Sequence, residues 1–212
     1  MEQYETDEQR GEAFKAWLAK NVPIILLGVA IGLGGVYGFN HYRAKAIETA
    51  SVNGDLFYRI LVAAEQSDVG KVKELVSTLD KTKDTSGYWA LSQLELAGAE
   101  LKSGSTDNAL QILDGITTST ADSSLKALAQ YRSARIYFDK KQMDKSRLVL
   151  NALVDSGFQG LRKELEGDIY LTEAKTMEAI EAFKAANVAG GATDLLPIKL
   201  ESLGIKLNNS EN

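Results

Sequence analysis

Residues 167–186 have the sequence GDIYLTEAKTMEAIEAFKAA, in which two stretches of helical hydrophobic spacing are separated by a short polar turn. Related units precede it along the chain. Each of the three units contains two small residues that lie twelve positions apart: Ala97 with Ala109, Ala134 with Ser146, and Gly167 with Ala179. Small side chains allow two helices to approach closely, so the sequence predicts three consecutive helical hairpins.

A period of about 34 residues with small residues at this offset is the signature of tetratricopeptide repeats. The repeats are degenerate, because none has the early Trp of the pattern and Ser146 stands where Ala is usual. A chance match within another protein of helical hairpins is the alternative. Hairpins of this kind bury their faces only by stacking on neighbours, which creates a concave surface for extended or helical partners. We therefore predict an all-α fold that contains a tetratricopeptide-repeat-like α-solenoid.

The apolar pattern is helical from about residue 45 onward, and short Gly, Ser, Asp and Thr clusters divide it. The predicted helices cover residues 45–66, 69–80, 86–103, 106–115, 122–140, 143–156, 158–173, 176–187 and 194–206. We expect Thr193 and Asp194 to cap the last of them. Residues 207–212 have nothing apolar to bury, so we expect a disordered tail there.

The most apolar stretch is VPIILLGVAIGLGGVYGF at residues 22–39, which contains no charged residue. Its length is close to the roughly 20 residues that a helix needs to cross a bilayer. Trp17 precedes it and Tyr37 and Tyr42 mark its far end, where aromatic rings prefer the headgroup layer. We predict a transmembrane helix over residues 21–41. A buried helix of a soluble domain is the alternative, although such helices rarely lack a polar face.

A cleaved signal peptide is a second alternative, because Ala44 and Ala46 have the spacing that a signal peptidase recognises. However, residues 1–20 are rich in acids, and the apolar run is longer than the 7–15 residues of a usual signal peptide. We therefore predict an uncleaved signal anchor. The charges that flank it are nearly balanced, so they do not set its orientation.

Two further features lie in this N-terminal part. Residues 1–20 are predicted to form an acidic segment with an amphipathic helix, because apolar residues recur there at helical spacing: Ala13, Phe14, Trp17 and Leu18. Within the apolar stretch, two pairs of glycines have the spacing that permits close contact with another membrane helix: Gly28 with Gly32, and Gly34 with Gly38. A simple abundance of glycine in membrane helices is the alternative.

Composition excludes most common chemistry. The chain of 212 residues has a net charge of −5, which does not favour nucleic-acid binding. It has no Cys and only one His, His41, so we expect no thiol chemistry, no metal site, no cofactor and no catalytic residues. Glu164 and Asp168 could form an acid–base pair on one helical face, but a solvated repeat face is the simpler interpretation.

The order of the parts is distinctive. An acidic start, MEQYETDEQRGEAFKAWLAKN, is followed by one Gly-rich membrane helix and then by repeats such as ALSQLELAGAELKSGSTDNALQIL. From about residue 1 to residue 205, this order resembles the ancillary subunit of the bacterial SecYEG translocon, the YfgM-like family of single-pass inner-membrane proteins. The most specific part of the resemblance runs from Tyr4 to Trp17.

This resemblance implies a cytoplasmic segment at residues 1–20 and a periplasmic repeat domain at residues 42–206. It also implies association with the Sec translocon and with a membrane-anchored periplasmic chaperone of the prolyl-isomerase type, so that newly exported proteins are handed over. The family has no catalytic residues to transfer. A membrane-tethered repeat scaffold for envelope assembly or cell division is the alternative function.

In tetratricopeptide repeats the first helix of each pair lines the concave side. That register gives the candidate partner-binding residues Leu94, Gly98, Lys102, Tyr131, Arg135, Glu164 and Asp168. Tyr131 and Arg135 lead this set, because Tyr and Arg most often dominate binding energy. The alternative is that Tyr131 packs in the core and that Arg135 pairs with Asp139.

Overall fold

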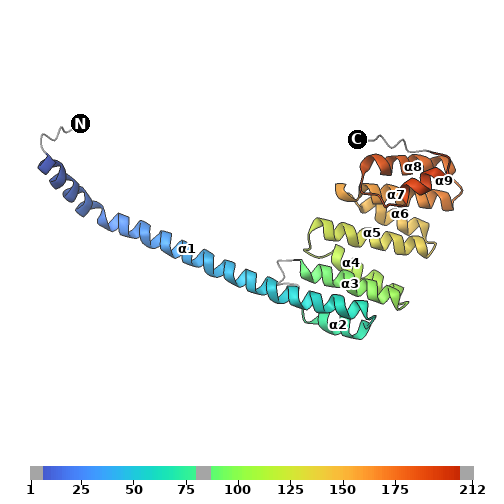
Figure 1. The fold of residues 1–212 in the computed structure, drawn as a ribbon, viewed down its shortest axis with the longest axis horizontal. Helices are drawn as coiled ribbons and strands as arrows, with labels where there is room; N and C mark the ends of the chain where they lie inside the picture. The colour runs from blue at the N-terminus through green and yellow to red at the C-terminus, as the bar shows by residue number, and fades with distance from the viewer. Residues whose placement is uncertain (1–6, 80–86, 206–212) are drawn as a thin grey trace. The chain divides into compact units, whose positions relative to one another are not determined.

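The computed structural model describes residues 7–79 and 87–205 (Figure 1). These described residues form nine α-helices and one short 3-10 turn, with no strand among them. The prediction of an all-α fold is therefore confirmed. The chain divides into two compact units, Met1–Ser51 and Val52–Asn212, which are described separately below. The tail predicted to be disordered, residues 207–212, and the first six residues of the acidic segment lie outside the described residues.

The first unit is formed by helix α1, which spans Asp7–Glu65 and continues into the second unit. The sequence predicted separate helices over this range, but the helix is continuous and contains Pro23 in its interior. The apolar side chains of residues 22–39 lie exposed, including Ile24 at 71% and Leu33 at 68%. This exposure contradicts the alternative of a buried core helix. By length and composition, α1 contains a segment able to cross a membrane.

The glycines of the predicted membrane-helix contact lie on the exposed surface of α1. A Cβ atom at Gly28, Gly32, Gly34 or Gly38 would meet no atom within 4 Å. At 100° per residue, the two pairs fall on different sides of the helix. Each pair therefore offers a separate small-residue face to another helix.

The second unit consists of the end of α1 and the remaining helices in order. These are α2 (Val69–Ser77), α3 (Tyr88–Lys102), α4 (Thr106–Thr117), α5 (Ser123–Asp139), α6 (Met143–Ala152), the 3-10 turn η1 (Ser156–Phe158), α7 (Gln159–Thr172), α8 (Thr176–Ala189) and α9 (Leu196–Ser202). Most bounds lie within three residues of the predicted ones. The main differences are that α6 and α9 each end four residues before the predicted position, at Ala152 and Ser202.

The predicted cap of the last helix is wrong. Leu195 precedes the first residue of α9, and no side chain caps the helix there. The Thr193 hydroxyl donates to the carboxylate of Glu164 and accepts only a long hydrogen bond, 3.3 Å, from the N–H of Leu195. Thr193 therefore joins this segment to α7 instead of serving as the N-cap of α9.

One turn geometry recurs between the helices of the hairpins. The residue two positions before the second helix has a positive φ in each turn: Ser67 (59°), Gly104 (87°), Lys141 (59°) and Ala174 (60°). The next residue donates its N–H to the carbonyl five positions earlier, for example Ser105 to Glu100 at 2.8 Å and Lys175 to Tyr170 at 2.9 Å. This 6→1 bond is the Schellman closure of a helix C-terminus.

These turns show four hairpins, one more than the small-residue pattern indicated. The turns at Ser67 and Gly104 are 37 residues apart, like those at Gly104 and Lys141. In the first hairpin, formed by the end of α1 and α2, Ile60 and Val72 stand where the next repeat has Ala97 and Ala109. Both are fully buried. The sequence search missed this repeat because its key positions hold large residues.

The core follows the stack of hairpins from α1 to α9. It consists of four successive clusters, and neighbouring hairpins contact each other through α2 and α3, α4 and α5, and α6 and α7. The small residues of the repeat pattern lie inside it. Ser146 is fully buried and donates its hydroxyl proton to the carbonyl of Ala134 at 2.8 Å, so this departure from Ala is satisfied.

Close helix contact in the last repeat hairpin depends on Gly167. A Cβ atom at this position would overlap the ring of Phe183, a fully buried residue of α8. Because Gly167 and Phe183 both lie in the packed interior, the ring has no free volume into which to move. Glycine at this position is thus the condition for α7 and α8 to pack as they do.

We expect Gly167→Ala to lower the free energy of unfolding by about 1–3 kcal/mol, because the added methyl group overpacks the α7–α8 contact. The matched control is Gly115→Ala in α4, where a Cβ atom would meet nothing within 4 Å. That change should stabilise the chain by up to about 1 kcal/mol, since Ala is the better helix former. Thermal unfolding followed by circular dichroism measures both; equal shifts would contradict the assigned packing.

Candidate partner-binding face

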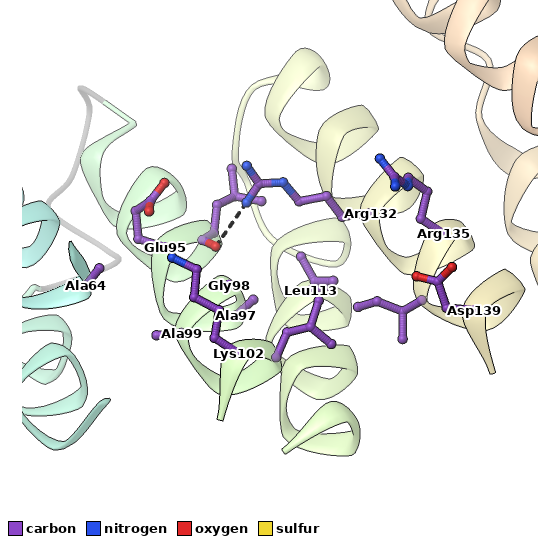
Figure 2. A pocket seen from close by; sticks show the side chains of 13 residues that line it. Ala64, Glu95, Ala97, Gly98, Ala99, Lys102, Leu113, Arg132, Arg135 and Asp139 are labelled. Carbon is purple, nitrogen blue, oxygen red and sulfur yellow. Dashed lines mark hydrogen bonds between the residues drawn. The ribbon is translucent and has the colours of Figure 1, made fainter. Parts of the chain in front are cut away.

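A hollow of about 370 Å³ lies between α3 and α5 (Figure 2). We call it the α3–α5 hollow. Its floor is apolar and includes the buried side chains of Leu94, Leu113 and Ile136. Its rim is charged, with side chains from both helices: Glu95 and Lys102 from α3, and Arg132, Arg135 and Asp139 from α5. An apolar floor with a polar rim is the usual form of a site that binds a partner side chain.

Gly98 helps to form the hollow. It lies in the interior of α3, and a Cβ atom there would meet no atom within 4 Å. Glycine in a helix interior costs about 1 kcal/mol relative to alanine, and no packing contact at this position requires it. The space that its missing side chain leaves open belongs to the hollow.

Among the described residues, one of the five rim charges is hydrogen-bonded. Arg132 donates from Nη1 to the carbonyl of Leu94 at 3.0 Å, as the dashed line in Figure 2 shows. Within residues 7–79 and 87–205, the other four make no hydrogen bond or ion pair: Glu95, Lys102, Arg135 and Asp139. The Arg135–Asp139 pair, which was the alternative interpretation of Arg135, is therefore not formed.

Several charges elsewhere on the repeats are paired. Lys140 binds Asp107 at 2.8 Å, and Arg147 binds Glu173 at 2.6 Å. Hydrogen bonds from Arg147 and then Lys175 lower the pKa of Glu173 to about 2.

A second, smaller hollow of about 100 Å³ lies beside α5 and α7. It shares Arg135 and Asp139 with the first, and its lining includes Tyr131, Glu164 and Asp168. The structure therefore brings the seven candidate residues to two adjoining hollows. Leu94, Gly98 and Lys102 line the first, Tyr131, Glu164 and Asp168 line the second, and Arg135 lines both.

Three of the seven candidate residues are buried rather than exposed at the surface. Leu94, Tyr131 and Glu164 are 2%, 9% and 2% exposed. Tyr131 belongs to the core cluster of α5, α6 and α7, which agrees with the core alternative, and burial raises the pKa of its phenol. These residues shape the hollows from below, whereas Lys102 and Arg135 are exposed at the rim.

The interpretation of Glu164 as part of a solvated face is wrong. Its carboxylate accepts hydrogen bonds from the N–H of Thr193 at 2.7 Å and from the Thr193 hydroxyl. Lys199 of α9 donates to it at 2.8 Å and to Asp168 at 2.7 Å. Glu164 and Asp168 therefore hold α9 against α7.

Burial and pairing shift the pKa values of Glu164, Asp168 and Lys199 in opposite directions. Burial raises the pKa of Glu164, but hydrogen bonds from Lys199 and Thr193 outweigh burial, and its pKa lies below the ordinary value. Burial lowers the pKa of Lys199, but hydrogen bonds to Asp168 and Glu164 leave it raised. For Asp168, burial dominates, and its pKa is raised despite Lys199.

Sequence reasoning missed Arg132 and Lys199. Arg132 lies 38 residues from the carbonyl that it binds, and Lys199 lies 35 residues from Glu164. Neither has a local signal, because a lysine or arginine on a helix is ordinarily solvated. Only the stacking of helices brings these partners together.

A family model described as a tetratricopeptide repeat-like domain matches residues 15–205, which is most of the chain. The chain belongs to this family. The match covers the apolar segment of α1 as well as the repeats.

Curated relatives are similar over nearly their whole length. The "Ancillary SecYEG translocon subunit" of Escherichia coli is 25% identical over 209 residues, which cover 99% of this chain and 98% of the relative. Proteins of the same description from Haemophilus influenzae and Neisseria gonorrhoeae are 23% and 26% identical, covering 96% and 80% of this chain and 97% and 83% of the relatives. The resemblance derived from the sequence is confirmed. No solved structure matches the chain.

We expect Lys199→Met to lower the free energy of unfolding by about 2 kcal/mol at pH 7, because it leaves the buried carboxylate of Glu164 without its cation. Lys184→Met, at an exposed lysine of α8, is the matched control and should be within about 0.5 kcal/mol of the parent.

The difference in stability between the parent and Lys199→Met should depend on pH, with a defined sign. In the parent, Glu164 has a lowered pKa, so its contribution to stability is present above pH 4.5 and is lost as the pH falls through the folded pKa. In Lys199→Met the unpaired buried carboxyl has a raised pKa, and protonation relieves its cost. The difference in melting temperature should therefore shrink between pH 7 and pH 4; a constant difference would contradict the network.

Proposed function

We propose that this protein is a membrane-anchored interaction subunit associated with the Sec translocon of the bacterial inner membrane. The observation that carries this proposal is the similarity to the E. coli ancillary SecYEG translocon subunit over 99% of the chain. The similarity includes the exposed apolar segment of α1 and the repeat solenoid. The function is therefore assigned to the two parts acting together.

In this proposal α1 crosses the inner membrane over residues 21–41 as an uncleaved anchor. Residues 1–20 are cytoplasmic and residues 42–206 are periplasmic. The apolar segment of 18 residues spans about 27 Å as a helix, close to the hydrocarbon thickness of about 30 Å. Because the flanking charges do not set the orientation, the proposed topology rests on the similarity to the translocon subunits.

The repeat solenoid is proposed to bind a membrane-anchored periplasmic chaperone of the prolyl-isomerase type and to aid the handover of exported proteins. The α3–α5 hollow supports a role in binding, because it combines an apolar floor with rim charges that make no ion pair among the described residues. Hollows of this size suit single side chains of a partner, and the surrounding face supplies charge complementarity.

Co-purification tests the association. The tagged full chain, extracted with mild detergent, should retain SecY and the other translocon subunits at several times the level retained by an unrelated single-pass protein. Absence of translocon subunits, with envelope-assembly or division proteins in their place, would favour the alternative of a membrane-tethered scaffold.

The two glycine faces of α1 allow a sharper version of this experiment. If Gly28 and Gly32 contact another membrane helix, the double change Gly28→Leu/Gly32→Leu should reduce translocon recovery at least fivefold. Gly34→Leu/Gly38→Leu places the same two side chains on a different face and is the matched control. Both variants should insert normally, because leucine is more apolar. Equal recovery would assign the contact to the solenoid.

Cysteine labelling tests the topology, since the natural chain has no cysteine. Gln111→Cys, at an exposed position of α4, should react with a membrane-impermeant maleimide once the outer membrane alone is opened. Gly11→Cys, at an exposed position of α1, should react only after the inner membrane is also breached. The opposite pattern would reverse the proposed orientation.

A further inference from the structure

We propose that the α3–α5 hollow takes one large apolar side chain of an acidic partner segment. The apolar side chain is seated over Gly98, and a neighbouring carboxylate of the same segment binds Lys102 or Arg135. This inference rests on the proposed function, since it assigns a chemical character to the partner of the same face. It adds that the partner must carry an apolar side chain beside a carboxylate, and that Gly98 selects for the apolar side chain.

The shape of the hollow carries the apolar half of the inference. Its volume of about 370 Å³ lies at the small end of ligand pockets, which favours one aromatic or long aliphatic side chain over a whole helix. The floor beneath Gly98 is made of Leu94, Leu113 and Ile136, none of which offers a polar side-chain atom. An apolar group that enters displaces water from this floor.

Gly98 controls access to this floor. A Cβ atom at Gly98 has open space around it, so the helix itself does not require glycine here. The contrast is Gly167, where a Cβ atom would strike Phe183. At Gly98 the absent side chain opens the hollow to a ligand, whereas at Gly167 it permits helix contact.

The charges of the rim support the second part of the inference, that the partner segment is acidic. Three cationic side chains surround the hollow against two carboxylates, although the chain as a whole has a net charge of −5. Arg132 is held by the carbonyl of Leu94, and Figure 2 shows it extending over the floor from α5, opposite Lys102 on α3. Lys102 and Arg135 make no ion pair in the described parts of the chain. A partner carboxylate would pair with either of them.

Fluorescence anisotropy on the full chain in lipid nanodiscs tests the inference, with empty nanodiscs as the blank. The probe is the fluorescein-labelled peptide Gly-Ser-Glu-Phe-Leu-Glu-Ser-Gly. One comparison peptide has Ala in place of Phe and Leu, and a second has Lys in place of both Glu residues. We expect saturable binding of the probe and at least tenfold weaker binding of the alanine peptide and of the lysine peptide.

Matched variants locate the site. Gly98→Leu fills the hollow and should weaken binding of the probe at least tenfold. Gly115→Leu introduces the same side chain at another open glycine, in α4, and should leave the affinity within twofold. Arg135→Glu should weaken the probe about fivefold and strengthen the lysine peptide. Circular dichroism melting curves confirm that each variant is folded.

The outcomes separate this inference from the proposed function. Absence of saturable binding by the parent chain, or unchanged affinity in folded Gly98→Leu, overturns the apolar half. Equal affinity for the lysine peptide overturns the acidic half. If the probe binds as expected but translocon subunits do not co-purify, the proposed function fails while the inference stands; the reverse result leaves the function intact and removes the inference.

Discussion

The backbone hydrogen bond that closes each hairpin turn is the interaction on which the solenoid depends. The N–H after the left-handed residue donates to the carbonyl five positions earlier, and this bond recurs at four places in the stack. Three of the left-handed residues, Ser67, Lys141 and Ala174, are not glycine. Each accepts a conformation that costs about 1–2 kcal/mol, and the bond and the packing around it offset that cost.

The recurring turn geometry determines which helices lie next to each other. Once each hairpin has the same geometry, α3, α5 and α7 come to lie as successive first helices, and the second helices stack between them. The α3–α5 hollow follows from this arrangement, because its floor combines residues of α3, α4 and α5. Gly98 enlarges it without any compensating contact. The candidate site is thus a consequence of the stacking and of one missing side chain.

The end of the stack is stabilised differently. There, α9 covers α7 and is held by the carboxylates of Glu164 and Asp168, which bind Lys199. A buried carboxylate is costly unless it is paired and fully hydrogen-bonded, and Glu164 meets this condition through Lys199 and Thr193. The second hollow ends at this network, so the free charges of the face are those around Lys102 and Arg135.

Helix α1 satisfies two different requirements. Around residues 22–39 its apolar side chains are exposed on all sides, which suits a lipid environment. Near its end, Ile60 and Ala63 are buried against α2, as in an ordinary repeat helix. The same helix therefore belongs to the membrane segment and to the first hairpin.

The sequence by itself determined the all-α class, the apolar segment of α1, most helix bounds and three of the four hairpins. These features depend on local spacing, either the helical period or a small residue twelve positions from another, and local spacing is visible in one chain. The tertiary structure decided the fourth hairpin, the burial of Tyr131 and Glu164, and the roles of Arg132 and Lys199. The contacts of Glu164, Arg132 and Lys199 join residues 29 to 38 positions apart, and only the stacking of hairpins sets which side chains meet across that distance.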